Sequence, residues 1–554
     1  MKNILLLLLF SVTYSSLVAQ SHGHHHGHTF TEADTLRGAL RPERTAYDVT
    51  FYDLNIQLDI DEKFIHGYVD VHYDAVNTFE RLQIDLFENM KLLRVEFEGK
   101  NLDFSRLHHA VFIDFPKQKK GSSGRFRLHY EGHPIVARQA PWDGGFVFDQ
   151  HEGKPWVGVA CEGTGASLWW PNKDHLSDEP DSMSIRVAVA PGLMVASNGN
   201  LRDTTLLSNG YTRYDWFVSY PINNYNVSIT VADFAHFSDV YVAADGDSLA
   251  LDYYVLPENL EKARRQFQQV PKMLACYETY LGKYPFWEDG FAMIETPYLG
   301  MEHQSGIAYG NHYMRGYLGG MIPADMDWDY IIIHETGHEY FGNAVSVNDH
   351  AEMWIHESFT TYLESIYVEC VYGYQDAMRY LRYQRGLVAN KEPILGPLEV
   401  NFKDFRSSDY YFKGALMLNN LRHAINDDEL WFDCLRSFYQ RYQIGHAVTQ
   451  DFVDYVQHCT QRDYSHFFEQ YLQHPDLPIF EYEITKISPT RTQLRYRWQA
   501  DVNDFDMPLL VGDSAAYERI FPTNKWQTQV LNVAISDFEV ADELFYIESK
   551  EQNK

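Results

Sequence analysis

Hydrophobic positions change their period twice along the chain. From about Tyr47 to Asp252, apolar and polar residues alternate, as in the run that contains Tyr52, Leu54 and Ile56. Alternation with a period of two is typical of half-buried antiparallel strands, and the Gly, Asn and Asp clusters between the runs supply turns. The pattern therefore predicts an all-β domain over residues 47–252.

The period becomes helical after Pro257, where apolar residues such as Leu260, Ala263 and Phe267 recur at steps of three and four. Pro271 is expected to kink this first helix. Helical patterning continues to about residue 473, and alternation resumes beyond Asp476. We therefore expect a mostly helical domain over 253–475 and a small C-terminal β module over 476–554, which together with the β domain make an α+β multidomain protein.

The first nineteen residues have the order of a secretory signal. Lys2 precedes an apolar stretch from Ile4 to Phe10, and the segment ends at Leu17-Val18-Ala19. We expect residues 1–19 to be cleaved as a signal peptide and the protein to be secreted, to the periplasm or beyond the cell. The apolar run is about half the roughly twenty residues that a membrane-spanning helix needs, so no stable membrane anchor is expected.

Residues 20–46 follow the signal as a His-rich segment that we expect to be mobile. The tract His22-Gly23-His24-His25-His26-Gly27-His28 has no means of building a core. Neutral imidazoles are good zinc ligands, so the tract could capture zinc, and it could equally be a solvated linker. The sequence leaves both interpretations open.

Charge and cysteine content exclude several classes of protein. The formal net charge is −31, and it becomes −32 once Lys2 leaves with the signal; such a surface repels nucleic acid and anionic membranes. The five cysteines lie far apart without any CxxC pair, which argues against a thiolate zinc site and against a disulfide-dense scaffold. One or two disulfides remain open, and the odd count leaves at least one thiol unpaired. The oligomeric state is not encoded in any of these features.

The segment Ile331-Ile332-Ile333-His334-Glu335-Thr336-Gly337-His338 carries an HExxH motif in apolar surroundings. Residues four apart share one face of a helix, so both imidazoles can bind one metal ion. Glu335 lies about 100° further around the helix, where a general base could reach a water molecule on the metal.

A catalytic zinc site needs a third protein ligand and leaves its fourth position to water. Downstream, the segment Trp354-Ile355-His356-Glu357-Ser358 supplies Glu357, nineteen positions after His338. The expected ligands of one Zn²⁺ ion are therefore His334, His338 and Glu357.

These residues resemble the aminopeptidase N family of zinc metallopeptidases, in which HExxH is followed by a glutamate after eighteen residues. Leu299-Gly300-Met301-Glu302-His303 is similar to the family's Gly-x-Met-Glu-Asn loop, from which Leu299 and His303 depart. Tyr411-Phe412-Lys413-Gly414 fits the family's Tyr-x-Lys-Gly motif, and Cys161-Glu162 resembles a segment that reaches from the N-terminal domain into the active site. The resemblance covers nearly the whole mature chain.

The resemblance implies a thermolysin-like catalytic domain and an aminopeptidase that acts on peptides with a free N-terminus. It assigns Glu302 to binding of the substrate amine, with Glu162 as a second carboxylate, and it assigns oxyanion stabilisation to Tyr411. A cationic His303 would oppose the substrate ammonium, so activity is expected to weaken below the pKa of that imidazole. The short C-terminal module cannot supply the helical cap of many relatives, which implies a more open site or one covered by a partner chain.

Other functional classes remain as alternatives. An endopeptidase would use the same zinc chemistry without a pocket for the amine, and a silent relative would bind peptides without cleaving them. A zinc carrier would account for the histidine tract, but it leaves Glu302 and Tyr411 unexplained. There is no GxSxG, no P-loop and no dinucleotide-binding pattern.

Overall fold

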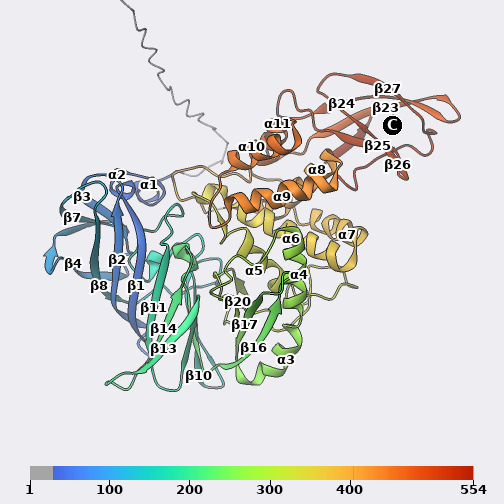
Figure 1. Ribbon diagram of the computed structural model, residues 1–554. Helices are drawn as coiled ribbons and strands as arrows, with labels where there is room; N and C mark the ends of the chain where they lie inside the picture. The colour runs from blue at the N-terminus through green and yellow to red at the C-terminus, as the bar shows by residue number, and fades with distance from the viewer. Residues whose placement is uncertain (1–28, 404, 553–554) are drawn as a thin grey trace, which may run out of the picture.

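The computed structural model describes residues 29–403 and 405–552 and arranges them in three parts (Figure 1). An N-terminal β part and a mostly helical part lie side by side, and a C-terminal β module stands on the helical part. This arrangement confirms the predicted α+β multidomain fold. The predicted signal peptide and the histidine tract lie outside the described residues. Within the described ranges, no helix combines the length and the apolarity needed to cross a membrane.

The N-terminal part is built around an eight-stranded sheet, in which only the pairing of β1 with β11 is parallel. Its strands, in spatial order, are β13 (Asn200–Leu206), β14 (Thr212–Val218), β11 (Ser182–Val189), β1 (Tyr47–Asp59), β2 (Phe64–Ala75), β8 (Ser123–Gly132), β4 (Met90–Phe97) and β5 (Lys100–Leu102). The alternation in the sequence marks these strands correctly, since Tyr52, Leu54 and Ile56 of β1 are all buried.

Two smaller sheets complete the N-terminal part. One consists of β3 (Phe79–Asp85), β7 (Ala110–Gln118) and β6 (Phe104–Leu107). The other consists of β12 (Met194–Ser197), β15 (Ile229–Ala232), β10 (Lys154–Ala160) and β9 (Gly145–His151). The loops before β9 and after β10 face the helical part and contribute to the cleft described below.

The prediction of a mobile segment over residues 20–46 is wrong for residues 29–46, the part that the structure describes. Residues Glu32–Gly38 and Pro42–Thr45 form helices α1 and α2. Arg37 contacts the Asp174 carboxylate at 3.1 Å and Arg44 contacts Asp85 at 2.6 Å, with all four side chains buried. Buried guanidinium–carboxylate pairs of this kind hold the segment on the β part, and polar composition alone does not reveal them.

The predicted boundary at residue 252 falls inside a strand. A five-stranded sheet contains β16 (Ala235–Val242), β17 (Ser248–Val255), β18 (Phe291–Glu295), β20 (Ile307–Tyr309) and β19 (Gly300–Met301). Because β17 pairs with β18 in parallel, the hairpin of β16 and β17 belongs to the same sheet as the strands that precede the zinc motif. Alternation identifies a strand but not the sheet that it joins.

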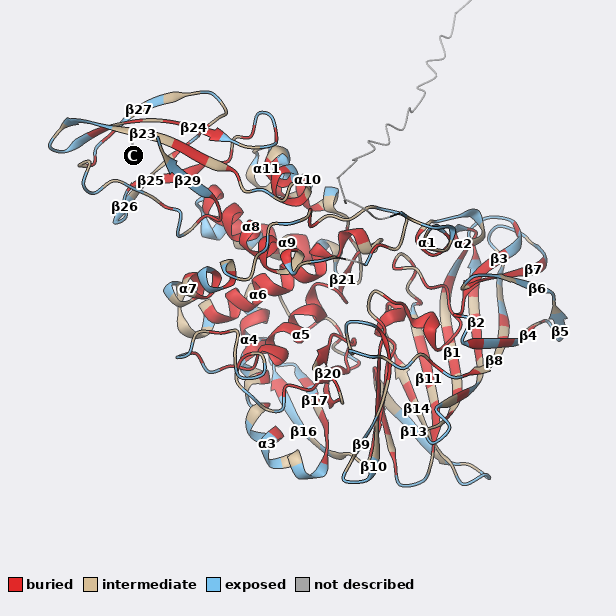
Figure 2. Ribbon diagram, turned by 180° about the vertical axis from the view of Figure 1, so that it is seen from behind, coloured by how far each residue is buried: buried red, intermediate tan, exposed pale blue. Residues whose placement is uncertain are grey.

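The helical part packs against one side of this sheet, and helices α5, α6 and α8 are almost entirely buried (Figure 2). Its helices are α3 (Leu260–Gln266), α4 (Gln269–Tyr280), α5 (Tyr330–Tyr340), α6 (Trp354–Tyr372), α7 (Tyr374–Arg385), α8 (Asp409–Ile425), α9 (Asp428–Tyr442), α10 (Thr449–Thr460) and α11 (Ser465–Gln473). A two-stranded ladder joins β21 (Val345–Ser346) to β22 (Gly445–His446).

The expected kink at Pro271 is instead a full break between α3 and α4. Pro271 lies in the first turn of α4, where a backbone N–H has no partner within the helix. A disulfide joins Cys276 of α4 to Cys370 of α6, while Cys161, Cys434 and Cys459 are free thiols. The sequence left one or two disulfides open, and the structure contains one among the described residues.

The C-terminal module consists of two small sheets, as the renewed alternation predicts. One contains β27 (Gln527–Leu531), β24 (Arg491–Gln499), β23 (Ile479–Ser488) and β29 (Glu548–Glu551). The other contains β26 (Ala516–Ile520), β25 (Leu509–Asp513) and β28 (Glu539–Val540). The module contacts α8 through hydrogen bonds such as that from Asn419 to the carbonyl of Leu544, and it lies beside the helical part, away from the N-terminal β part (Figure 1).

Candidate active site

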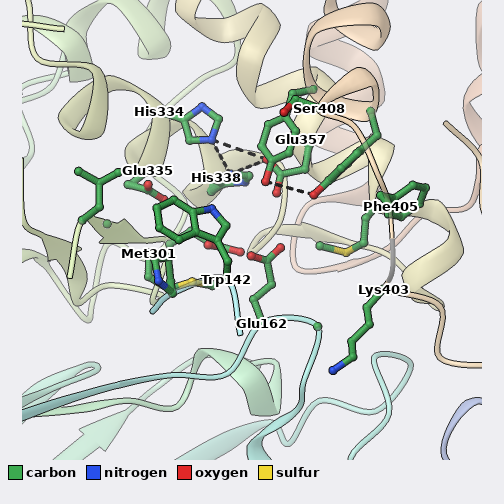
Figure 3. Close-up of a pocket in the computed structure, with 18 of the residues that line it drawn as sticks. Trp142, Glu162, Met301, His334, Glu335, His338, Glu357, Lys403, Phe405 and Ser408 are labelled. Carbon is green, nitrogen blue, oxygen red and sulfur yellow. Dashed lines mark hydrogen bonds and ion pairs between the residues drawn. The ribbon is translucent and has the colours of Figure 1, made fainter. Parts of the chain in front are cut away.

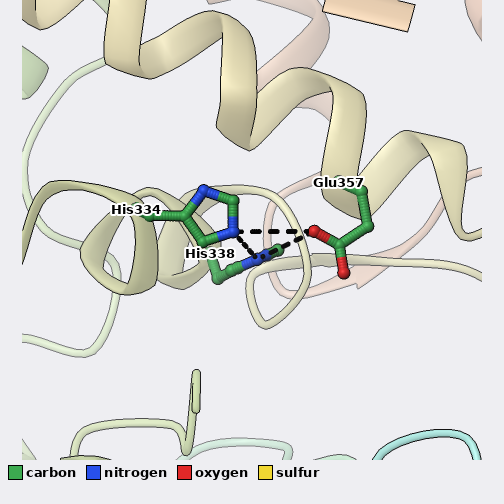
Figure 4. A group of neighbouring side chains, drawn as sticks. All are labelled: His334, His338 and Glu357. Carbon is green, nitrogen blue, oxygen red and sulfur yellow. Dashed lines mark hydrogen bonds and ion pairs between the residues drawn. The ribbon is translucent and has the colours of Figure 1, made fainter. Parts of the chain in front are cut away.

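Helix α5 presents the two histidines of the HExxH motif to one point. Asp329 caps the helix by accepting hydrogen bonds from the backbone N–H groups of Ile331 and Ile332, at 3.0 and 3.4 Å. The Nε2 atoms of His334 and His338 lie 3.2 Å apart. Helix α6 begins at Trp354 and carries Glu357 in its first turn. Oε2 of Glu357 lies 3.7 Å from Nε2 of His334 and 3.3 Å from Nε2 of His338 (Figure 4).

This triangle has the donor set and the spacing of a zinc site. Bonds of about 2.0–2.1 Å to a tetrahedral zinc place neighbouring ligand atoms about 3.3 Å apart, close to the three separations observed. All three side chains are buried, and Oε2 of Glu357 has no hydrogen-bond partner. A buried carboxylate oxygen without a partner is unfavourable unless a cation faces it. The residues present therefore fit one Zn²⁺ ion.

The outer nitrogens of both histidines are held by hydrogen bonds. Nδ1 of His334 lies 2.6 Å from Oε1 of Glu364, and Nδ1 of His338 lies 3.1 Å from the carbonyl of Phe341. Both acceptors require a proton on Nδ1, which leaves each Nε2 with a lone pair for the metal. The other oxygen of Glu364 accepts hydrogen bonds from Tyr380 and Gln384.

Glu364 was not identified from the sequence, although a signal for it exists. It follows Glu357 by seven residues in α6, which places the two carboxylates two turns apart on one helix face. Both carboxylates face α5. Glu357 lies against Nε2 of His334, and Glu364 lies against Nδ1 of the same ring. Glu364 therefore helps to orient His334, and its spacing from Glu357 in the sequence could have suggested this role.

Three further carboxylates surround the triangle. Glu302 and Glu335 lie close enough to His338 for one oxygen of each to approach its ring nitrogen within 4.8 Å. Burial raises the pKa of Glu335 to about 7. Burial, followed by the charge of Glu302, raises the pKa of Glu162 well above its ordinary value. Charged carboxylates crowded in one buried site are stabilised by cations that occupy it.

Glu302 is oriented by a residue that the sequence did not single out as functional. The hydroxyl of Tyr225 donates to Oε1 of Glu302 at 3.0 Å, and Asn343 donates to the backbone carbonyl of Glu302 at 2.7 Å. Tyr225 lies in a short 3₁₀ turn (Asn224–Asn226) before β15. It is far from Glu302 in the chain, so no local pattern identifies the pair.

Tyr411 lies in the first turn of α8 and lines the same cavity as the histidines. Its ring centroid is 6.1 Å from that of His334, and the hydroxyl of Tyr410 donates to the Tyr411 hydroxyl at 3.4 Å. Burial raises the pKa of Tyr411 well above its usual range. The phenol therefore keeps its proton and remains a hydrogen-bond donor toward the cavity.

The surroundings of His303 favour the neutral form of its imidazole. Its side chain is buried, and burial lowers the pKa of the imidazole to about 3. Any loss of activity through protonation of His303 is therefore expected only at strongly acid pH.

The cavity that contains these residues has a volume of about 820 Å³ and is formed by both large parts of the chain (Figure 3). The N-terminal part contributes Trp142 and Glu162 from two loops. The five-stranded sheet contributes Met301 and Glu302, and the segment before α8 contributes Phe405. All seven residues predicted for the site, from Glu162 to Tyr411, line this one cavity.

Comparisons with known proteins agree on one family. A model of the Peptidase family M1 domain matches residues 265–471. Aminopeptidase N of Escherichia coli (strain K12) is 24% identical over 293 residues, which cover 50% of this chain and 33% of that protein. Leucyl aminopeptidase of Saccharolobus solfataricus is 19% identical over 441 residues, which cover 76% of this chain and 53% of that protein. The chain thus spans about a third to a half of the length of these curated relatives.

Solved structures share the fold. An M1 zinc metallopeptidase from Deinococcus radiodurans has a TM-score of 0.63 at 19% identity, covering 78% of this chain and 94% of that chain. A mutant form of an M1 zinc metallopeptidase from the same organism, bound to a Tyr-Ser-Ala substrate, also has a TM-score of 0.63, at 20% identity and with 77% and 94% coverage. At this level of identity the likeness shows the fold.

Proposed function

Because the chain belongs to the aminopeptidase N family of M1 zinc metallopeptidases, we propose that it is a zinc-dependent aminopeptidase that hydrolyses the first peptide bond of peptides with a free N-terminus. The observation that carries the proposal is the buried triangle of His334, His338 and Glu357, which lies beside the carboxylates of Glu335 and Glu302. One zinc ion is the cofactor that this donor set fits.

When bound, zinc lowers the pKa of a water ligand to about 7 and polarises a carbonyl group. Glu335 accepts the proton of the attacking water and returns it to the leaving amine. Burial raises the pKa of Glu335 above that of an exposed glutamate, a direction that suits a group that must both take and give a proton. Tyr411 donates its hydroxyl to the oxyanion that forms, and loss of such a donor costs roughly 10²- to 10³-fold in rate in comparable enzymes.

Recognition of a free N-terminus needs negative charge one residue away from the scissile bond. Glu302 supplies it, with its carboxylate held by Tyr225, and Glu162 faces the same cavity from the N-terminal part. An ammonium group placed between these side chains would relieve the crowding of carboxylates in the site. This pocket favours an aminopeptidase over an endopeptidase, which has no use for it.

We also propose that the protein is secreted through its N-terminal signal, to the periplasm or beyond the cell. The disulfide between Cys276 and Cys370 supports this location, because disulfides persist in oxidising compartments and are rare in the cytosol. N-terminal sequencing of protein recovered from the periplasmic and extracellular fractions tests the proposal, with a chain beginning at Gln20 expected. A chain that stays in the cytosol with Lys2 in place would contradict it.

The activity is tested with fluorogenic aminoacyl amides, each with a free and with an acetylated amine. We expect hydrolysis of the free-amine compounds only, one zinc per chain by elemental analysis, and loss of activity on chelation. The Glu335→Gln variant should keep its zinc but lose at least about 10³-fold in kcat, whereas Glu88→Gln, at an exposed carboxylate of the N-terminal part, should match the wild type. Hydrolysis of acetylated substrates would instead indicate an endopeptidase, and no hydrolysis of any would indicate a silent peptide-binding relative.

A further inference from the structure

Trp142 is the only exposed tryptophan of the protein, and it lies in the wall of the cleft. All eleven tryptophans fall within the described residues, and the other ten are buried or half-buried. Trp142 exposes 60% of its surface and lines the cavity that contains the zinc ligands. A ligand that covers an indole exposed in a cleft removes apolar surface from water, which is favourable.

The loop that carries this indole is held in place by hydrogen bonds. The backbone N–H of Arg138 donates to Oδ2 of Asp143 at 2.5 Å, and Thr164 donates its hydroxyl to the carbonyl of Asp143 at 3.2 Å. Gly144 has a φ of +66°, and a Cβ atom there would lie 2.5 Å from the Thr164 hydroxyl. Gly144 therefore lets the loop lie close against Thr164, and these contacts hold the backbone of the loop that carries Trp142.

Thr164 joins this loop to the opposite wall of the cleft. Its hydroxyl also accepts a hydrogen bond from Nζ of Lys403 at 3.3 Å, and Lys403 lies in the segment that contributes Phe405 to the cavity. Glu162 lies only two residues before Thr164. The Thr164 side chain thus connects three segments by hydrogen bonds and chain continuity. These are the loop of Trp142, its own loop with the amine-binding Glu162, and the segment before α8.

Figure 3 shows the side chains of Trp142, Glu162, Met301 and Glu335, which all line the one cavity. A substrate whose amine is held by Glu302 and Glu162 carries its first side chain on the carbon next to that amine. This side chain must therefore enter the part of the cavity beside the two carboxylates. Trp142 and Met301, the residue directly before Glu302, are among the apolar residues that line this cavity.

We propose that Trp142 forms a wall of the subsite for the first substrate side chain and selects peptides with a large apolar N-terminal residue, aromatic residues above all. The inference rests on the proposed aminopeptidase function and deepens it. Contact between the indole and an aromatic or branched side chain removes apolar surface of both from water, and aromatic pairs gain further from their ring geometry. A small side chain such as that of alanine cannot reach the indole and gains nothing from it.

The test compares kcat/KM for the amides of phenylalanine, leucine, alanine and arginine in the wild type, Trp142→Ala and Trp142→Phe. For Trp142→Ala we expect a loss of about 10- to 100-fold for phenylalanine and leucine, and of less than about threefold for alanine. Trp142→Phe should keep most of the preference. Leu206→Ala is the matched control, since it truncates an apolar side chain that is 73% exposed and lies outside the cavity.

The possible outcomes separate this inference from the proposed function. Hydrolysis of the alanine amide by the wild type establishes the aminopeptidase whatever Trp142 does, and no hydrolysis of any free-amine compound overturns both proposals. An equal loss on all four substrates, or no loss, overturns the role of Trp142 alone. A selective loss on the arginine amide also overturns it, because the indole face would then bind a cation. Thermal unfolding of Trp142→Ala within about 1 °C of the wild type shows that the loop is intact, since the side chain removed is exposed.

Discussion

The glycine of the Tyr-x-Lys-Gly motif is required by the crossing of the two helices that carry site residues. A Cβ atom at Gly414 in α8 would lie 1.7 Å from Oγ and 2.5 Å from Cβ of Ser358 in α6, whereas real Cβ contacts essentially never fall under 3.0 Å. Ser358 directly follows the ligand Glu357, and its hydroxyl donates to the carbonyl of Tyr410 at 2.6 Å. Replacing Gly414 with alanine therefore disturbs the contact that places Tyr411 against the metal site.

The expected size of the effect follows from these contacts. An alanine in a helix is intrinsically better than glycine by about 1 kcal/mol. Rotation of the Ser358 hydroxyl would relieve the shorter contact, but it would break a hydrogen bond worth about 1 kcal/mol and leave the two Cβ atoms too close. Helices α6 and α8 must then separate, and overpacking of this kind costs about 1–3 kcal/mol, occasionally more. We expect Gly414→Ala to be destabilised by about 1–3 kcal/mol overall.

Catalysis should suffer as well, because the separation moves Tyr411 relative to Glu357. Displacements of about 1 Å at a catalytic group can cost about 10²-fold in rate, so we expect kcat to fall by about 10- to 100-fold. Urea unfolding followed by circular dichroism measures the stability, and hydrolysis of the alanine amide measures the rate. Gly386→Ala is the matched control, because its Cβ would meet nothing closer than 3.5 Å.

A second substitution in α6 tests the cause of the defect. Ser358→Gly removes both atoms that a Cβ at Gly414 would strike, so the double variant should recover kcat and lie within about 1 kcal/mol of the wild type, the difference being the lost hydrogen bond. Ser358→Ala leaves its Cβ in place and should not rescue. If Gly414→Ala behaves like Gly386→Ala in both assays, the helix crossing does not constrain the site and the reasoning is refuted.

Three further predictions concern the metal, the disulfide and acid stability. Glu364→Gln, which removes the charged acceptor of a zinc-ligand histidine, should weaken zinc binding by about 10- to 100-fold in competition with a chelator, and unchanged affinity would contradict a role for Glu364 in orienting His334. Replacing Cys276 and Cys370 together with alanine opens a cross-link between residues 94 apart in the chain and should lower the free energy of unfolding by about 2–4 kcal/mol, whereas reducing agent should no longer affect that variant. Burial lowers the pKa of His423 from 6.5 to about 4, so its contribution to stability is complete above pH 6.5 and is lost as the pH falls toward 4. Between pH 7 and pH 5 the wild type should lose about 2 kcal/mol more than His423→Gln, and equal losses would place the acid sensitivity elsewhere.

Local periodicity was enough to predict most of the strands and helices and the two histidine ligands of the metal. The two histidines of HExxH face one ion because four residues make about one helical turn, so the geometry of α5 is contained in the spacing itself. Alternation identified the strands of the N-terminal part and of the C-terminal module for the same reason. Glu357 and Tyr411 were found through motif order, and the structure brings both into the cavity with the histidines.

Features that depend on contacts between distant parts of the chain were decided only by the tertiary structure. The orientation of Glu302 by Tyr225, the disulfide partner of Cys276 and the position of Trp142 have no local pattern, because each is set by packing against a remote segment. Burial also reversed one expectation, because the buried ion pairs of Arg37 and Arg44 hold α1 and α2 on the β part. It favours the neutral form of His303 as well. Residue type fixes what a side chain can do, whereas its desolvation and its partners decide what it does, and both arise only when the chain has folded.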